Sequence, residues 1–306
     1  MTPAVSSAPR GPEPSAPPAS RGPEPSAAPA SRPLIMGVVN VTPDSFSDGG
    51  RWFEPDAAIA HGLELLEQGA DLLDIGGEST RPGAARPSED EELTRVIGVV
   101  RALADHGARI SVDTMRARVA ARALEAGAQL VNDVSGGLAD PQMGPLVASA
   151  GVPFVAMHWR AHSAQMDLEA RYADVVTDVI SELRQRVDVL LEAGVAPGSI
   201  ILDPGFGFSK DAGHNWQLLA GLDQVVALGY PVLVGTSRKR FLGRLDPAAD
   251  PDAEPTSPTE RDAATAATSL LAAQAGAWAV RVHDVPSTRD ALAVWDLVRS
   301  AGGNRG

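Results

Sequence analysis

The sequence contains no cysteine, and this absence excludes several kinds of chemistry. Without thiols there is no disulfide, no thiolate metal site and no cysteine nucleophile. Aromatic residues make up only 4% of the chain, and no apolar run approaches the roughly 20 residues that a membrane span requires. The lack of cysteine is typical of the reducing cytoplasm, so we expect a cytoplasmic protein with no membrane partner.

Positive charge is scarce as well. The chain has 26 Lys and Arg residues against 39 Asp and Glu residues, which gives a formal net charge of −13. Such a chain is unsuited to nonspecific nucleic-acid binding, which depends on a basic surface. A few local Arg and Lys side chains can still form one positive pocket for a small anionic substrate. We therefore expect small-molecule substrates and no nucleic acid.

Residues 1–32 differ in composition from the rest of the chain. Two similar 11-residue units, RGPEPSAPPAS and RGPEPSAAPAS, follow one another between residues 10 and 31. Too few large apolar side chains are present to offset the entropy of ordering, and the apolar stretch of a secretion signal is missing. The segment is predicted to be a disordered tail. Residues 302–306 are predicted to be a flexible C-terminus.

Residues 33–301 alternate between short β-branched segments and longer helical ones. The expected strands are 34–41, 71–76, 109–113, 129–134, 153–158, 199–203, 231–235 and 279–283. The expected helices are 56–68, 89–105, 115–126, 140–149, 168–193, 214–227, 258–274 and 287–300. Helical connections of this length imply parallel strands, and eight such units favour an α/β fold of the (β/α)8 TIM-barrel type. An open doubly wound sheet stays possible, because the number of strands does not demonstrate closure.

Polar residues stand at the end of every expected strand or just after it. They are Asn40, Asp74 with Glu78, Asp113, Asn132 with Asp133, His158, Asp203, Lys239, and Arg281 with His283. A single Asp or Asn in such a position often only caps the next helix. The C-terminal ends of barrel strands share one rim, so polar residues on all eight strands predict one pocket there.

Two long loops and one glycine-rich turn add to this pocket. Residues 42–50 (TPDSFSDGG) and 79–83 (STRPG) have the composition of mobile covers, although ordinary surface loops share it. Arg81 favours phosphate binding, since a guanidinium can contact two phosphate oxygens. Asp203 begins the segment DPGFGF. Its glycines let the backbone approach a ligand, and its carboxylate can accept two N–H donors from a flat heterocycle.

Asn40 and Asp44 are the expected ligands of a metal ion. Their oxygens lie near candidate phosphate-binding residues, and Mg²⁺ usually takes one or two protein oxygens together with phosphate and water. Zinc is not indicated, because the six His residues show no ligand spacing. Nucleotide cofactors are not indicated either, because the chain has neither a Walker loop nor a dinucleotide fingerprint.

Taken together, these segments resemble the dihydropteroate synthase family. The resemblance covers residues 34–300 and is carried by NVTPDSFSDGG, DIGGESTRPG, SVDT, NDV, DPGFGF, SRK and RVHDV, in this order at the strand ends. It implies a pterin-binding TIM barrel that condenses 6-hydroxymethyl-7,8-dihydropterin pyrophosphate with p-aminobenzoate in folate biosynthesis. It also implies a homodimer and a pocket in which sulfonamides compete with p-aminobenzoate.

The resemblance implies roles for residues of the predicted pocket. The pterin would be held by Asp113, Asn132, Asp203, Lys239 and Arg281. The pyrophosphate would be bound by Asn40, Arg81, Arg281 and His283, and p-aminobenzoate by Thr80, Pro82, Phe208 and the region of Lys239. Catalysis would depend on Asp113, Asp203, Lys239 and Arg281. Mg²⁺ would be held by Asn40 and Asp44.

The residue types suit a dissociative displacement. When the pterin methylene–oxygen bond breaks, negative charge grows on the pyrophosphate and positive charge on the methylene, and cations and carboxylates in one pocket stabilise both. The aniline nitrogen then attacks, so no nucleophilic side chain is needed. Three segments depart from the family pattern. Arg240 stands where many members have Ser, and the residues after His158 (WRAHSAQMD) carry few familiar signatures. The N-terminal repeat has no counterpart in the family pattern.

Two other functions are compatible with part of this pattern. Another pterin-binding barrel, such as a methyltetrahydrofolate–corrinoid methyltransferase, would share the pterin contacts. It would not need the pyrophosphate-binding set of Arg81, Arg281 and His283. A non-catalytic homologue would bind pterin without turnover, and its loop motifs should be damaged, whereas these motifs are intact.

Overall fold

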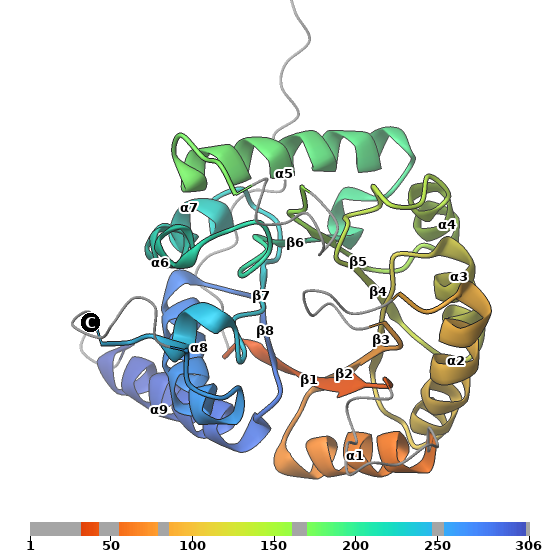
Figure 1. Cartoon of the computed structure of the whole chain (residues 1–306), viewed down its shortest axis with the longest axis horizontal. Coiled ribbons are helices and arrows are strands. Elements are labelled where there is room, and N and C mark those ends of the chain that lie inside the picture. The colour runs from red at the N-terminus through yellow and green to blue at the C-terminus, as the bar shows by residue number, and fades with distance from the viewer. Residues whose placement is uncertain (1–31, 43–54, 79–85, 161–169, 247–253, 304–306) are drawn as a thin grey trace, which may run out of the picture.

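A computed structural model of the chain describes residues 32–42, 55–78, 86–160, 170–246 and 254–303 (Figure 1). The predicted disordered tail, apart from Arg32, lies outside the described residues, as do residues 304–306 of the predicted C-terminus. No helix in the described ranges combines the length and apolar character needed to cross a membrane.

Eight parallel strands form the centre of the molecule. They are β1 (Leu34–Asn40), β2 (Leu72–Gly76), β3 (Ile110–Asp113), β4 (Leu130–Asp133), β5 (Phe154–Met157), β6 (Ile200–Asp203), β7 (Leu233–Val234) and β8 (Ala279–Val282). Their order is β6-β5-β4-β3-β2-β1-β8-β7. A parallel bridge between Leu202 of β6 and Val232, just before β7, joins the first and last strands in this order. The Leu202 N–H also donates to the carbonyl of Pro231 at 2.8 Å. The ring is therefore closed, which confirms the TIM barrel and excludes the open sheet.

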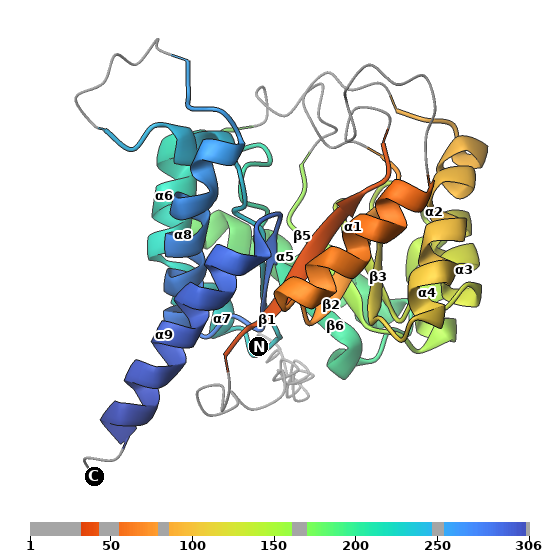
Figure 2. The ribbon, with the colours of Figure 1, turned by 90° about the horizontal axis from the view of Figure 1, so that it is seen from below.

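The helices surround this barrel, and Figure 1 looks down its axis. They are α1 (Pro55–Gln68), α2 (Glu89–Asp105), α3 (Ala117–Glu125), α4 (Met143–Ala150), α5 (Val175–Glu192), α6 (Ala212–Ala220), α7 (Leu222–Val226), α8 (Asp262–Ala275) and α9 (Val285–Gly303). Short 3₁₀ turns occur at η2 (Pro197–Ser199), η3 (Arg240–Gly243) and η4 (Thr259–Arg261). In the side view of Figure 2, β1 begins and α9 ends at the same end of the barrel.

Two expected helices differ from the observed ones. The helix expected over 168–193 begins only at Val175, because the Asp174 side chain accepts from the Thr177 N–H at 2.8 Å and caps the helix there. The helix expected over 214–227 is instead two helices, α6 and α7, which meet at Gly221. A Cβ on Gly221 would lie 2.9 Å from the Val176 side chain, so the break allows a close approach to α5.

The interior of the barrel contains two layers of side chains. Near the start of the strands, an apolar layer is formed by Met36, Leu72, Leu130, Val155, Ile201, Leu233 and Ala279. Alternate residues of a strand face the same side, so the next inward positions lie two residues further along. In β2, β4, β6 and β8 those positions are occupied by Asp74, Asn132, Asp203 and Arg281. The strand geometry thus puts polar groups directly above an apolar floor.

Candidate active site

A cavity of about 690 Å³ opens at the C-terminal ends of the strands. This volume suits a drug-sized ligand. All eight predicted substrate-binding residues that the structure describes line it, and these are Asn40, Asp113, Asn132, Asp203, Phe208, Lys239, Arg281 and His283. The other predicted residues, Asp44, Thr80, Arg81 and Pro82, lie outside the described residues. The structure therefore brings the eight described candidates together at one cavity, and their binding of substrate stays a prediction.

Arg281 belongs to the polar layer above the apolar floor, lines this cavity and joins two acidic residues. Its Nε donates to Asp74 Oδ2 at 2.6 Å, and its Nη2 donates to Asp113 Oδ2 at 2.8 Å. The same oxygen of Asp74 accepts from Asn132 Nδ2 at 3.0 Å. Asp74 is fully buried and does not line the cavity, so it orients Arg281 and Asn132 without reaching a substrate. The sequence singled out Asp74 as a strand-end residue but gave it no role in the site.

Burial raises the pKa of the two cavity carboxylates implied to hold the pterin. For Asp113 the burial effect exceeds the opposing effect of the Arg281 guanidinium, so its pKa is above the usual range. For Asp203 burial raises the pKa to about 6, although the Gly205 N–H, 2.7 Å from Oδ1, and the charge of Lys239 lower it. Inside the cavity, the ionised carboxylates lack the hydrogen bonds that water would donate to them. A ligand that donates N–H groups would replace those hydrogen bonds.

Lys239 and His283 also line the cavity. Lys239 Nζ is 3.9 Å from the centroid of the Phe208 ring, which is a cation–π contact. Burial lowers the pKa of Lys239 to about 8. His283 Nδ1 is 2.9 Å from the hydroxyl of Ser237, and this contact fixes the imidazole ring at the cavity wall. Lys239 and Phe208 therefore lie in contact with each other on the lining of the cavity.

Three of the polar strand-end residues stabilise the local structure of the protein. Asp133 accepts from the N–H groups of Ser135 and Gly137 at 2.7 and 3.0 Å, so it stabilises a turn. Glu78 lines the cavity but forms ion pairs with Arg86 at 2.6 Å and Arg116 at 3.3 Å.

His158 is the third of these residues. It is buried, and its Nε2 lies 2.9 Å from Glu182 Oε2. Asp133, Glu78 and His158 therefore stabilise local structure, as single polar residues at strand ends often do.

Lys210 also lines the cavity and was missed by the sequence analysis. Its Nζ contacts His158 Nδ1 at 3.0 Å, so it extends the His158–Glu182 pair into the site. A simple count would have drawn attention to it. The whole chain has two lysines, Lys210 and Lys239, among its 26 Lys and Arg residues, and both line this cavity.

Of the two predicted metal ligands, only Asn40 can be located, and it lines the cavity. Within the described ranges, no three His, Cys, Asp or Glu side chains come close enough together to hold a metal ion.

Known proteins are similar to this chain in sequence. Residues 36–283 match the family described as pterin binding enzyme. The dihydropteroate synthase of Mycobacterium leprae is 55% identical over 261 residues, which are 85% of this chain and 91% of that protein.

Solved structures of dihydropteroate synthases are also similar. That of Xanthomonas albilineans in complex with 7,8-dihydropteroate has a TM-score of 0.76 and 45% identity, covering 88% of this chain and 94% of that one. That of Yersinia pestis with a sulfonamide drug complex has a TM-score of 0.81 and 41% identity, covering 88% and 95%.

Proposed function

The chain belongs to the dihydropteroate synthase family of pterin-binding enzymes, and we propose how its cavity carries out that family's reaction. The protein is a transferase of folate biosynthesis that forms 7,8-dihydropteroate. Its substrates in this proposal are 6-hydroxymethyl-7,8-dihydropterin pyrophosphate and p-aminobenzoate. The observation that carries the proposal is the single cavity that the eight described candidate residues line. The methyltransferase alternative is not favoured, because the relatives of high identity are synthases.

The pterin would bind above the apolar floor, against Asp113, Asn132 and Asp203. Asp203 Oδ1 is occupied by the Gly205 N–H, which leaves Oδ2 for the ring. Asn132 presents an amide held by Asp74, so its carbonyl oxygen is directed by a fixed partner. Carboxylates that are short of hydrogen-bond donors bind a donor-rich heterocycle edge strongly. This match between donors and acceptors would orient the exocyclic methylene of the pterin.

The pyrophosphate would lie near Arg281, His283 and Asn40. Arg281 is already held by Asp74 and Asp113, so it needs little reorganisation when negative charge grows on the departing oxygen. As the methylene–oxygen bond breaks, Asp113 and Asp203 would stabilise the positive charge on the methylene. The aniline nitrogen of p-aminobenzoate would then attack this carbon and lose its proton after the new bond has formed.

p-Aminobenzoate would bind beside Phe208 and Lys239. The Phe208 ring offers a flat surface for the benzene ring, and the Lys239 ammonium above it offers a positive charge. Arg240 follows Lys239, begins η3 and lines the same cavity. It would add positive charge at the carboxylate end of this substrate. Loop residues Thr80 and Pro82 would complete the pocket.

Mg²⁺ would be held by Asn40 and Asp44 in this proposal. The fit rests on the donor set, since Asn40, whose side chain carries an amide oxygen, lines the same cavity as Arg281 and His283. Mg²⁺ takes most of its ligands from water and phosphate, so one or two protein oxygens suffice. When bound, the ion would supply positive charge to the pyrophosphate.

The test of the reaction is direct. Purified protein is incubated with the pterin pyrophosphate, labelled p-aminobenzoate and Mg²⁺, and labelled 7,8-dihydropteroate is measured. We expect product, and we expect excess EDTA to abolish most of it and Mg²⁺ to restore it. No product would overturn the proposed function, whereas product formation that is indifferent to EDTA would overturn only the metal assignment.

A homodimer is proposed as well, through the outer face of α8 and α9. Leu271 of α8 and Val294, Leu297 and Val298 of α9 are exposed, and Leu297 is 71% exposed. Leu297 and Val298 lie three and four positions after Val294, so both are neighbours of Val294 on the helix surface. Sedimentation equilibrium should give twice the chain mass, and a Leu297→Glu variant should give the monomer mass. A cytoplasmic location stays a prediction from the lack of cysteine.

A further inference from the structure

Lys210 forms an unusually complete set of hydrogen bonds beside the cavity. Its Nζ lies 3.0 Å from the Gly205 carbonyl, 3.2 Å from the Phe208 carbonyl and 3.0 Å from His158 Nδ1. An ammonium group has three N–H donors and no acceptor. Every donor of Lys210 therefore has a partner within the protein, and two of the partners belong to the turn that follows Asp203.

The contact with Lys210 fixes the protonation of His158. Because Nδ1 accepts a hydrogen bond, the ring proton resides on Nε2, which donates to Glu182 Oε2 at 2.9 Å. Arg160 Nε also donates to this carboxylate oxygen, at 3.0 Å. Burial and the positive charge of Lys210 lower the pKa of His158 to about 4, which keeps the ring neutral. Lys210, His158 and Glu182 thus form a chain of directed hydrogen bonds that ends on α5.

Lys210 contacts the same peptide that orients Asp203. The Gly205 carbonyl accepts from Lys210, and the Gly205 N–H donates to Asp203 Oδ1 at 2.7 Å. The turn has no spare room here. Gly205 has a φ of +70°, and a Cβ on it would lie 2.4 Å from the His158 carbonyl oxygen. Displacing Lys210 would therefore release the turn and let the Asp203 carboxylate rotate.

We propose that Lys210 is a positioning residue of the pterin subsite. It locks the Gly205–Phe208 turn so that Asp203 Oδ2 faces the substrate, and its positive charge favours the ionised form of Asp203. This inference rests on the proposed function, in which Asp203 accepts N–H donors from the pterin.

Electrostatics supports this role. The charged and titratable groups around Lys210 are Asp203, Arg160, Glu182, Lys239, His158 and Tyr172, whose ring centroid is 5.8 Å from Nζ. Burial lowers the pKa of Lys210 to about 7, and Asp203 is the strongest opposing influence. In the other direction, the charge of Lys210 is among those that lower the pKa of Asp203. Removing this charge should move the ionisation of Asp203 to higher pH.

Steady-state kinetics of Lys210→Met and Lys210→Gln tests the proposal. We expect kcat/KM for the pterin pyrophosphate to fall on the order of tenfold to a hundredfold in the Met variant, the size typical of lost hydrogen bonds to a charged group. The loss should come mainly from a higher KM for this substrate. The Gln variant should recover part of it, because its amide can donate to the Gly205 carbonyl. In both variants the acid limb of the pH profile should move to higher pH.

Arg101→Met serves as the matched control, since it removes one positive charge from an exposed position on α2. It should leave KM and the acid limb unchanged. A Lys210→Met protein that melts normally and keeps the wild-type KM and acid limb would overturn the inference. Equal losses of kcat/KM for both substrates with unmoved limbs would also overturn it, because they indicate a merely structural residue. An inactive wild-type protein would instead count against the proposed function.

A second measurement needs no variant of Lys210. In full-length protein labelled with ¹⁵N-lysine only two side-chain amines exist, and Lys239→Arg assigns them. We expect the Lys210 amine to titrate near 7, to exchange slowly with water, and to shift when a pterin is added. Fast exchange of the Lys210 amine with water and no shift on addition of a pterin would show that the three hydrogen bonds do not hold in solution, and the inference would be wrong.

Discussion

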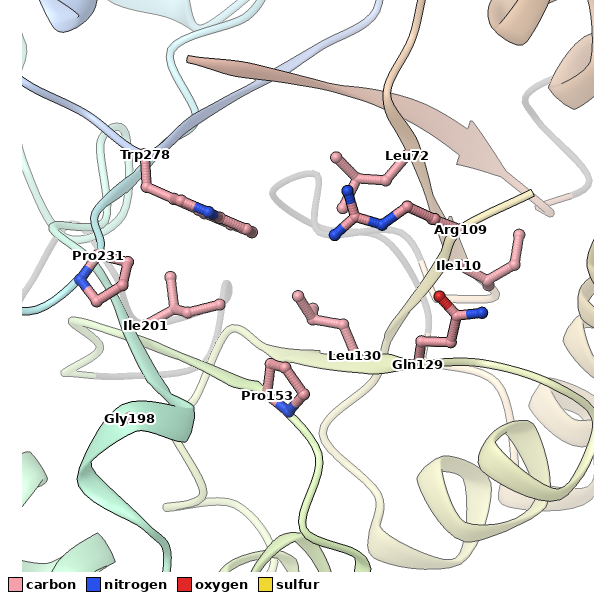
Figure 3. Close-up of a pocket in the computed structure, with 10 residues that line it drawn as sticks. All are labelled: Leu72, Arg109, Ile110, Gln129, Leu130, Pro153, Gly198, Ile201, Pro231 and Trp278. Atoms are coloured by element: carbon pink, nitrogen blue, oxygen red, sulfur yellow. The ribbon is translucent and has the colours of Figure 1, made fainter. Parts of the chain in front are cut away.

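The two mouths of this barrel are formed by the same strands and have opposite chemistry. The upper mouth, at the C-terminal ends of the strands, contains the cavity of about 690 Å³ with its Asp, Lys and Arg residues. The lower mouth, at the N-terminal ends of the strands, contains a cavity of about 190 Å³, in which Leu72, Leu130, Ile201 and Trp278 face one another (Figure 3). Its polar members, Arg109 and Gln129, directly precede β3 and β4, and both residues are exposed.

Positions two residues apart on one strand make this difference. Leu130 faces the lower mouth and Asn132 the upper one, and Ile201 and Asp203 repeat the pattern on β6. The backbone fixes where each side chain points, so the sequence can vary each mouth independently. Catalysis at the C-terminal face and stability at the opposite face is the arrangement found in TIM barrels generally. Burial raises the pKa of its carboxylates, so we expect the upper mouth to lower the stability of the folded protein at neutral pH.

The largest expected effect is at the upper mouth. Arg281→Ala removes the cation that contacts Asp74 and Asp113, and with it the preorganised charge for the pyrophosphate. We expect kcat/KM to fall by on the order of a thousandfold, the upper size seen when one preorganised donor is lost. Calorimetry should show weaker binding of the pterin pyrophosphate. Arg109→Ala at the lower mouth is the control, and equal activity of the two variants would abolish the distinction between the mouths.

The lower mouth should show the reverse behaviour. Ile201 is 5% exposed and belongs to the apolar floor, so Ile201→Ala enlarges a cavity in the packed interior. The free energy of unfolding should fall by about 2–4 kcal/mol, as for other large-to-small core substitutions. Denaturant titration measures this loss. The variant should keep the wild-type KM values at 25 °C, and a large rise in KM would mean that the floor also shapes the site.

Asp203 of the upper mouth should have opposite effects on activity and on stability. It should be required for activity and should lower the free energy of unfolding. Its folded pKa of about 6 exceeds the ordinary value of 3.8, so the folded state retains the proton to higher pH than the unfolded state does. Wild-type stability is therefore lost as pH rises from about 4 to about 6. Asp203→Asn has no such loss. Its free energy of unfolding should exceed that of the wild type by about 1–3 kcal/mol at pH 7, with little difference near pH 3.

Thermal unfolding of both proteins across this range measures the effect. An Asp203→Asn variant that is less stable than wild type at pH 7 would show that burial does not dominate at this carboxylate. Asp113 gives the control, because its pairing with Arg281 makes Asp113→Asn break an ion pair as well.

Most of the fold could be predicted because its signals are local. Strand positions follow from β-branched runs, and the expected limits of the strands agree with the observed ones to within about two residues. The start of α5 could not be placed, because residues after position 168 have helical composition and only the cap at Asp174 sets the boundary. The break at Gly221 was also missed, since it depends on packing against Val176 of α5.

The site was predictable to the extent that barrel geometry brings strand ends together. Asp113, Asn132 and Arg281 stand at strand ends, so their convergence follows from closure alone. The partners that orient them do not follow from it. Asp74 and Arg281 are 207 positions apart, and Lys210 and His158 are 52 apart. Such pairs depend on side-chain rotamers in the packed structure, and no sequence spacing encodes these.

The smallest expected effect returns to the lower mouth, where the chain enters the barrel. Arg32 donates to both carboxylate oxygens of Asp71, at 2.7 and 3.1 Å, and Asp71 also accepts from the Ile35 N–H at 2.7 Å. Both side chains of the pair are partly exposed, so the ion pair should contribute less than about 1 kcal/mol. Deleting residues 1–31 should leave kcat/KM and the melting temperature unchanged. Adding Arg32→Ala should lower stability only slightly, because the Ile35 N–H still satisfies Asp71. A loss of turnover in either protein, measured beside the full chain, would mean that this entrance contributes to the site at the other mouth.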